Sequence, residues 1–321
     1  MRPVLASVRS SSSLRFLRAT ATATAAAAFA LLLCATPRAS ACHTVSEYGS
    51  ASVRPSTAAE VSVEYAEFNL GARSGSYVVV APSLEWAPHS RLSLALRVPI
   101  ARLTYRGSAM SSSAQFSIGL RQALAPSTRE LVTSSGLGDL GTSAKVALWN
   151  NGRVSLSAGL GLELPTGDQA AGLGGGHFEL SPFLSFSARL GARGTIYGVV
   201  TDRLAVGAAS GQGAALHAGA LVAKHVTAGE PASLHGSLLS PHSDHELVVR
   251  VGAAYLWERF YVSGGAEQIA VWSGENGGLV LRAEAGAVLG GGLRIALGYD
   301  APVVGAERYA WRGRLGVQWL F

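Results

Sequence analysis

The chain has 321 residues, of which 48% are hydrophobic and only 14% charged, and it contains 39 glycines. This composition is too apolar for a disordered protein. It also carries fewer charges than a typical soluble domain, in which about a quarter of the residues are charged. The length is compatible with one large all-β domain.

The first 41 residues have the pattern of a secretory signal peptide. Four arginines precede an uncharged run over 19–34, and Ala39-Ser40-Ala41 has the A-x-A form of a cleavage site. The segment holds five arginines and no acidic residue, so its removal lowers the formal charge from +6 to +1. We therefore expect a mature chain without the basic surface that nucleic-acid binding requires. A retained membrane anchor is the alternative, although the apolar run is short for one.

The two cysteines predict no disulfide within the mature chain. Cys34 is lost with the leader, and Cys42 would become the first mature residue. Lipidation of Cys42 is a further hypothesis, which the Arg38 and Ala39 that precede it do not favour. Residues 42–57 are expected to form a short periplasmic N-terminal segment.

From residue 58 onward the dominant pattern has period two, which is typical of β-strands. Between 154 and 164 the even positions are Val, Leu or Ala, and the odd positions are Ser, Gly and Glu. About 11 residues of this kind match the length of a tilted strand that crosses a bilayer. Because small and charged residues share the second face, the pattern predicts a transmembrane antiparallel up-and-down β-barrel with a polar lumen over residues 58–321.

Short and long connections alternate along the chain, as they do in outer-membrane barrels. This alternation predicts about 14 strands, an even number that leaves both ends of the barrel in the periplasm. Weak alternation over 194–202, 213–225 and 232–240 leaves 12 strands as the alternative, and an additional strand near 115–121 is also considered. The expected spans are 58–68, 75–86, 91–102, 138–149, 153–164, 177–189, 194–202, 213–225, 232–240, 245–257, 259–271, 277–288, 292–300 and 309–321.

Aromatic residues cluster near the ends of these spans, where amphipathic rings favour the membrane–water interface. We expect Trp86, Trp149, Trp257, Phe260 and Trp319 at the periplasmic rim and Tyr105, Trp272, Tyr299 and Trp311 at the outer rim. The final segment alternates Leu315, Val317, Trp319 and Phe321 with more polar residues. It is similar to the C-terminal strand by which outer-membrane proteins are recognised during barrel assembly, so these four residues are the expected assembly signal.

Charged residues on the second face are the candidate lumen residues. One interpretation is a closed, salt-bridged interior, because charges cannot face lipid cheaply; the other is a polar pore. The candidates for a pore lining are Arg97, Lys145, Glu163, Glu246, Arg250, Glu267, Arg282, Glu284, Arg312 and Arg314, with Glu60, Glu64, Glu85 and Arg294 on the same face.

One stretch of about 50 residues resembles a known family. Gly136-Leu137-Gly138-Asp139, then Lys145, then Leu164-Pro165-Thr166-Gly167 and a glycine-rich loop look like the outer-membrane proteins named for the putative MetA pathway of phenol degradation. The segment Ser240 to Leu247 is also similar to a late part of that family. The resemblance implies an outer-membrane barrel and, more weakly, transport of hydrophobic or aromatic compounds.

Enzymatic chemistry is not expected. His242, Ser243, Asp244 and His245 lie together, but their spacing fits no metal-binding or catalytic motif. Gly172 to Gly176 lacks the helix and βαβ unit of a nucleotide-binding loop. We expect no catalytic residue, metal or cofactor.

The expected function is a passive channel or facilitator for small molecules, including hydrophobic or aromatic ones, in the bacterial outer membrane. A structural or surface-interaction barrel with a closed lumen is the alternative, and an outer-membrane hydrolase is a weaker one. The expected partners are membrane lipid, the barrel assembly machinery and a small solute.

Overall fold

The computed structural model describes residues 53–70, 73–106, 131–206, 235–237, 239–242, 245–271, 277–305 and 308–321. One compact unit, residues 41–320, contains every strand. The strands are β1 (Ala58–Leu70), β2 (Arg73–His89), β3 (Leu92–Arg97), β4 (Ile100–Arg106), β5 (Leu131–Leu137), β6 (Leu140–Asn150), β7 (Val154–Leu164), β8 (Phe178–Leu190), β9 (Gly194–Val206), β10 (His235–Ser237), β11 (Ser240–His242), β12 (His245–Trp257), β13 (Phe260–Val271), β14 (Gly278–Val288), β15 (Leu293–Gly305) and β16 (Trp311–Leu320).

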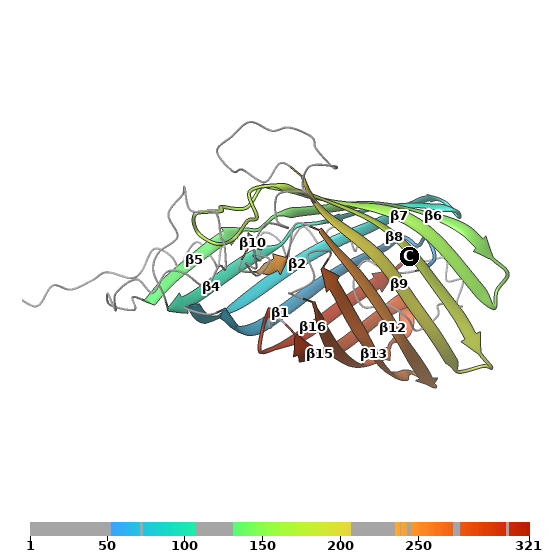
Figure 1. Cartoon of the computed structure of the whole chain (residues 1–321). Coiled ribbons are helices and arrows are strands. Elements are labelled where there is room, and N and C mark those ends of the chain that lie inside the picture. The colour runs from blue at the N-terminus through green and yellow to red at the C-terminus, as the bar shows by residue number, and fades with distance from the viewer. Residues whose placement is uncertain are drawn as a thin grey trace, which may run out of the picture. The chain divides into compact units, whose positions relative to one another are not determined.

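The main sheet closes on itself, because β1 pairs with both β2 and β16 (Figure 1). Every pairing in it is antiparallel. In the wall, β3 and β4 together form one strand position beside β2, and β5 and β6 together form the next. The described residues therefore form a barrel of 12 strand positions, with the separate hairpin β10–β11 in addition.

The barrel class is confirmed, and the strand number is the alternative one, 12 and not 14. β9 pairs directly with β12, so neither of the two weakly alternating spans between them joins the described wall. The span 213–225 lies outside the described residues. Within 232–240 the described residues contain only the three-residue β10, which pairs with β11, and the start of β11. Because two neighbouring spans drop out together, the number of strands stays even.

Two predicted boundaries are wrong because the strands are longer than expected. The chain after β3 breaks at Val98-Pro99 and continues as β4 to Arg106, and the returning strand begins at Leu131. Pro99 has no N–H to donate to a ladder, and its carbonyl instead accepts a 2.9 Å bond from Gly138 N at the facing break. The expected loop over 103–137 therefore shortens to 107–130, which lies outside the described residues together with the candidate strand near 115–121. Similarly, β1 and β2 extend through the expected loop at 69–75.

The two ends of the barrel differ. We call the end that carries the short connections β2–β3, β6–β7, β8–β9, β12–β13 and β14–β15 the turn end, and the other the loop end. β1 starts and β16 finishes at the turn end. This arrangement matches the expected alternation of connections except at β1–β2, where Leu70 pairs with Arg73 and the connection at the loop end is short.

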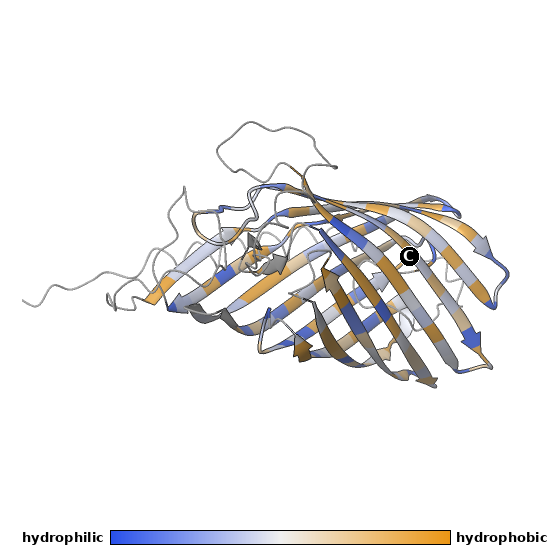
Figure 2. Ribbon diagram, viewed as in Figure 1, coloured by the Kyte–Doolittle hydropathy of each residue, from blue (hydrophilic) through white to orange (hydrophobic). Residues whose placement is uncertain are grey.

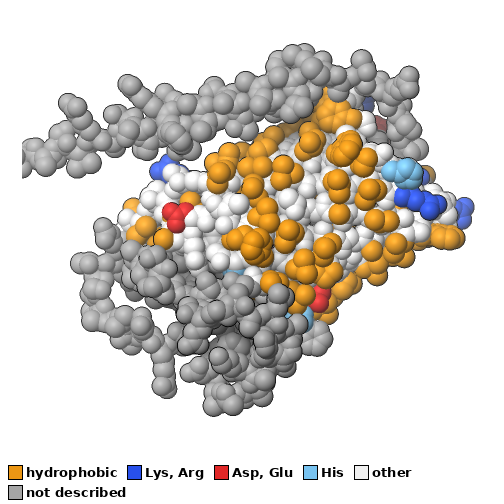
Figure 3. All heavy atoms as spheres, turned by 90° about the horizontal axis from the view of Figure 1, so that it is seen from above, with side chains coloured by type: hydrophobic (Ala, Val, Ile, Leu, Met, Phe, Trp, Pro, Cys, Tyr) orange, Lys and Arg blue, Asp and Glu red, His pale blue; other side chains and the backbone are white. Residues whose placement is uncertain are grey.

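The outward face of the wall is apolar. Leu160, Leu184, Val251 and Leu297 are between 46% and 64% exposed although they lie in the middle of strands. Figure 2 shows hydrophobic and hydrophilic residues alternating along the strands, and Figure 3 shows hydrophobic side chains spread over the outer surface. Such alternation is that of a transmembrane barrel with its apolar side outward. Among the described residues, no helix is long and apolar enough to cross a membrane.

The turn end carries the expected aromatic residues on its outer surface. Trp86, Trp149, Trp257 and Phe260 are each more than half exposed. Trp319 lies near the end of β16.

At the loop end, Tyr299 stacks on Trp311 at 6.2 Å between ring centroids, and Tyr65 lies 5.1 Å from Trp311. The expectation for Tyr105 is wrong, since its side chain is 1% exposed and packs inside the barrel. Trp272 lies outside the described residues.

Candidate functional site

A band of ion pairs crosses the inner wall from β12 to β16. Glu267 accepts a hydrogen bond from Arg250 at 2.6 Å and forms an ion pair with Arg282 at 2.9 Å. Asp300 accepts from Arg312 at 2.5 Å and lies 3.7 Å from Arg282, which links the two groups. Charges in this band therefore neutralise one another across adjacent strands.

The band continues to β1, where the barrel closes. Glu64 lies 3.7 Å from both Arg312 and Arg314. It also accepts a 3.1 Å hydrogen bond from the Tyr77 hydroxyl on β2. A cavity of about 50 Å³ remains beside the band, with Arg250, Arg282 and Arg314 in its lining.

A second ionic group surrounds Glu246, whose side chain is fully buried. Arg308, in the loop between β15 and β16, donates to Glu246 through two nitrogens, one of them at 2.9 Å. Arg203 lies 3.8 Å from Glu246 and donates to both oxygens of Glu179 at 2.9 and 3.0 Å. Arg308 therefore ties the described part of this loop, residues 308–310, to β12 and holds it inside the barrel.

Nearer the turn end, the inner wall holds two smaller groups of interacting polar and charged side chains. The Tyr261 hydroxyl donates to Glu284 at 2.6 Å, and Arg294 donates to that hydroxyl at 3.0 Å. On the other side, Lys145 pairs with Glu85 at 2.9 Å. The register places all of these side chains on the inner face.

All ten of the expected pore-lining residues occupy inward-facing register positions. Nine of them are buried or partly buried, and Arg97 alone is exposed among them. Glu163 faces Glu179 on β8 and is partly buried. Whether these residues line an open pathway stays a prediction.

Sequence reasoning missed four lumen residues. Glu179 and Asp300 share the inward parity of their neighbours, so the alternation rule could have found them. Arg203 lies one residue beyond the expected span 194–202, in which the alternation is weak. Arg308 lies in a loop, where no periodic pattern indicates the direction of a side chain.

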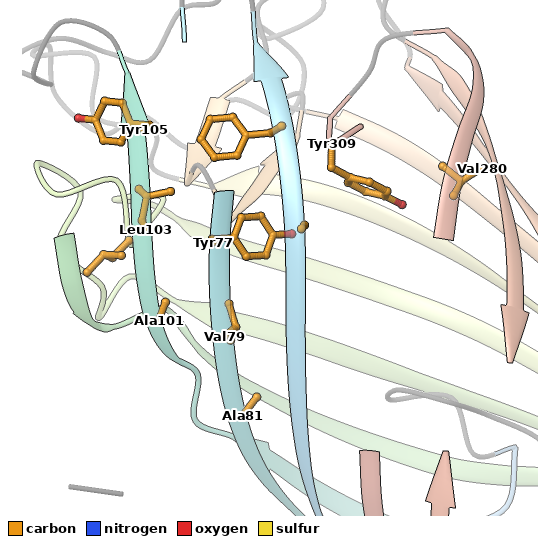
Figure 4. Packing of buried hydrophobic residues seen from close by; sticks show 11 residues of the cluster. Tyr77, Val79, Ala81, Ala101, Leu103, Tyr105, Val280 and Tyr309 are labelled. Carbon is orange, nitrogen blue, oxygen red and sulfur yellow. The ribbon is translucent and has the colours of Figure 1, made fainter. Parts of the chain in front are cut away.

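Near the loop end, the inner wall of β1, β2 and β4 is apolar rather than charged. Figure 4 shows these side chains gathered against one another, with Tyr309 from the β15–β16 loop beside them. Burial raises the pKa of the Tyr309 hydroxyl. The Tyr309 ring lies 4.6 Å from the Arg312 guanidinium, where the apolar wall meets the ionic band. The buried members of this apolar cluster are Ala66, Phe68, Tyr77, Val79, Ala81, Ala101, Leu103, Tyr105, Leu173, Val280 and Tyr309.

The carboxylate of Asp139 holds the loop between β7 and β8, residues 165–177, against this cluster by two hydrogen bonds. Asp139 accepts from Gly167 N at 2.8 Å and from Gly175 N at 2.5 Å. Leu173, which is 2% exposed, thereby packs into the apolar cluster. A Cβ at Gly174 would lie 2.4 Å from the Gly167 carbonyl oxygen, so only glycine permits this close approach.

The segment 53–57 crosses the lumen near the turn end. The Ser157 hydroxyl on β7 donates to the Val53 carbonyl, and Arg54 donates to Ser155 at 2.8 Å. At its other end, Thr57 accepts from Ala87 N on β2 at 3.1 Å. We call residues 53–57 the strap, because they connect two wall strands that do not pair with each other.

The histidine-rich segment does not form a site that the structure describes. His245 lies 2.7 Å from Asp202 on outward-facing register positions. Ser243 and Asp244 lie outside the described residues, as does the side chain of His242. No group of metal-ligating side chains occurs among the described residues. Gly172 to Gly176 belong to the loop that Asp139 fastens.

Comparisons with known proteins support the fold. No family model and no curated protein sequence match the chain. A crystal structure of an outer membrane channel from Pseudomonas putida F1 is 16% identical, covers 86% of this chain and all of its own, and superposes with a TM-score of 0.54. The NanC porin (8% identity, 81% and 98% coverage, TM-score 0.48) and the toluene transporter TbuX of Ralstonia pickettii (10%, 83% and 90%, 0.40) are also similar.

The chain therefore has the fold of outer-membrane β-barrels. The narrower resemblance to the phenol-degradation family, which rests on the residues from Gly136 to Ser187, stays a prediction.

Proposed function

We propose that this protein is a passive outer-membrane channel for small molecules that carry an apolar portion. The observation that supports the proposal is the apolar cluster inside the loop end of the barrel. Barrel lumens are ordinarily polar, whereas Phe68, Tyr77, Leu103 and Tyr105 all turn inward here. An apolar solute would gain roughly 25 cal/mol for each Å² that it buries against such a wall.

The segments that cover this wall would act as its gate. Leu173 and Tyr309 come from two different connections and pack on the strand residues of the cluster. Each is anchored by charge-assisted hydrogen bonds near it, Leu173 through Asp139 and Tyr309 through the neighbouring Arg308. Binding loops over a rigid scaffold are a common device, so we propose that these two loops move when a solute enters.

We propose the bacterial outer membrane as the location. The apolar outer face would contact the hydrocarbon core of the bilayer, and the exposed aromatic residues at the turn end would lie at the membrane–water interface. Membrane lipid would contact the outward leucines and valines. The barrel assembly machinery would recognise the C-terminal strand through Leu315, Val317, Trp319 and Phe321.

Reconstitution tests the channel directly. Purified protein in planar bilayers should give discrete conductance steps, and proteoliposomes should take up a small aromatic probe such as toluene faster than protein-free vesicles. Leu103→Asn should slow uptake of the aromatic probe more than that of a polar probe, while Ser93→Asn, also inward-facing, should not discriminate. Absence of both steps and uptake would contradict the proposal.

A structural barrel with a closed lumen is the second candidate. It is favoured by the ion pairs from Arg250 to Glu64, which leave only a small cavity beside them. The same reconstitution separates the candidates, because a closed barrel would insert into the bilayer without any current or flux.

A further inference from the structure

Four of the five described turns at the turn end carry an arginine in the same position. Arg91, Arg153, Arg193 and Arg259 each directly precede the first residue of the next strand. Each main-chain carbonyl accepts a hydrogen bond of 2.7 to 2.9 Å from the neighbouring strand, namely from Ala147, Arg189, Leu256 and Val288. The four arginines are thus fixed at equivalent places around one rim.

The register places these four positions on the inward side of the wall. Each lies one residue before an outward-facing position such as Leu92, Val154 or Phe260, which pair with Val146, Ala188 and Ala287. The arginines therefore surround the mouth of the lumen, and the outward aromatic residues lie on the other side of the wall. We call these four residues the mouth arginines.

The fifth turn, between β14 and β15, has no arginine at the equivalent position because the backbone leaves no room for a side chain. Its equivalent residue is Gly292, which has φ of +80°, and a Cβ there would lie 2.4 Å from the Leu320 carbonyl oxygen. Any side chain at this position would clash with the last strand. Every described turn at this end that can hold a side chain at this position therefore carries an arginine.

In the part of the chain that the structure describes, the positive charge of the mouth is not neutralised by nearby carboxylates, whereas the arginines deeper in the lumen are paired with acidic side chains. All four mouth arginines are exposed, and none of their side chains forms an ion pair with another described residue. The nearest exposed acid along the chain is Glu258 in the β12–β13 turn. The deeper arginines, by contrast, face Glu64, Glu267 and Asp300 at short distances.

Arg97 extends this positive potential into the barrel. It is the one exposed residue among the described ionisable side chains at inward strand positions deeper than the mouth. Its neighbours in the ladder are Ser83 and Gly141, which are uncharged and small. An ion that passes the mouth would therefore meet a second accessible guanidinium.

From this arrangement we propose that the mouth arginines and Arg97 make the channel selective for anions. A ring of like charge around an aqueous opening concentrates counter-ions, and guanidinium groups pair well with carboxylates. The inference rests on the proposed function and narrows it. Combined with the apolar cluster, it identifies small amphiphilic carboxylates, an apolar body with one carboxylate, as the substrate class.

Reversal potentials across a salt gradient test the inference. The wild-type channel in 0.1 M KCl should favour chloride over potassium by at least about threefold. Replacing all four mouth arginines by glutamine should bring the permeability ratio close to 1, and Arg97→Gln alone should lower it partially. The matched control replaces Arg102 and Arg106, exposed arginines on outward positions of β4 near the loop end, and should leave the ratio unchanged.

The salt dependence provides a second measurement on the same channels. Because the screening length falls from about 10 Å at 0.1 M to about 3 Å at 1 M, the anion preference should weaken at high salt. Benzoate should also reduce the chloride current of the wild type more than benzyl alcohol does.

The outcomes separate the two proposals. A wild-type protein that gives no conductance contradicts the proposed function itself. A conducting protein without anion preference, or one whose preference survives the fourfold substitution, overturns this inference and leaves the channel in place.

Discussion

The carboxylate of Asp139 binds the main chain of Gly167, 28 residues further on, through a 2.8 Å hydrogen bond. The same junction joins Thr166 to Gly138, since the Thr166 hydroxyl donates to the Gly138 carbonyl at 3.0 Å. The Gly-Asp pair and the Pro-Thr-Gly sequence therefore form the two halves of one loop anchor. This anchor holds Leu173 inside the barrel.

The first prediction concerns that anchor. Asp139→Ala removes two charge-assisted bonds to backbone N–H groups, each worth about 1.5–3 kcal/mol, so residues 165–177 should detach. Hydrogen exchange of these residues should rise at least tenfold, and the aromatic flux of the reconstituted protein should increase. Asp168→Asn is the control, because Asp168 bonds only within the loop, to Ala171 N. Equal protection of the loop in the wild type and in Asp139→Ala would show that other contacts hold it.

The second prediction concerns the buried pair between Arg308 and Glu246. Glu246→Gln leaves the Arg308 guanidinium without its charge partner in a buried position, and breaking such a pair costs about 3–5 kcal/mol. The urea midpoint of the refolded barrel, followed by its mobility shift on unheated gels, should fall accordingly.

A double substitution tests the origin of that loss. Replacing both residues, as Glu246→Leu with Arg308→Leu, removes the unpaired charge as well as the pair, so it should recover much of the stability. If the double variant loses as much stability as Glu246→Leu and Arg308→Leu lose when measured separately and added, the two residues do not act as a pair.

The third prediction concerns the strap. Arg54→Ala together with Ser157→Ala removes two of the bonds that hold residues 53 and 54 against β7. We expect a larger single-channel conductance, because the strap would no longer cross the lumen at the turn end. Ser62→Ala is a suitable control, since Ser62 faces the lumen but bonds only to Ala81 on the neighbouring strand. Unchanged conductance in the double variant would mean that the strap does not limit flow.

The sequence predicts the wall of this barrel well and its interior less completely. Alternation identifies strands such as 154–164 because every second residue must avoid lipid, and this constraint acts at each position independently. The error at Tyr105 arises because the expected strand ended at residue 102. Tyr105 has the same inward parity as Arg97, and β4 continues the pairing with β2 in the register of β3, so the alternation places its side chain inside the barrel once the strand is extended to Arg106.

The contacts that hold the loops inside the barrel cannot be predicted from local sequence patterns. The bond between Asp139 and Gly175, and that between Arg308 and Glu246, join residues 36 and 62 positions apart. They depend on how loops fold back, which period-two patterns do not encode. The glycines of the β7–β8 loop indicated a turn but not the direction in which Leu173 points.

The fourth prediction concerns the end of the chain. Deleting Phe321 should reduce the amount of folded protein in the outer membrane, because we expect the assembly machinery to read the final aromatic residue. The measurement is the fraction of heat-modifiable barrel in membrane fractions. Phe321→Trp should restore it, since the side chain stays aromatic. Full insertion of the deletion variant would contradict the role assigned to this residue.

The last prediction tests which part of the outer surface meets hydrocarbon. Leu160 on β7 and Leu131 on β5 are both outward and exposed, at 46% and 61%. Leu160 lies in mid-strand among apolar neighbours, whereas Leu131 pairs in register with Arg106, beyond the outward Arg102. An arginine at the bilayer midplane costs about 2–4 kcal/mol, and near the interface about 0–1 kcal/mol. Leu160→Arg should therefore reduce the free energy of unfolding in lipid vesicles by that larger amount, and Leu131→Arg should have little effect. If both substitutions cost the same, the apolar belt does not end where the arginines of β4 begin.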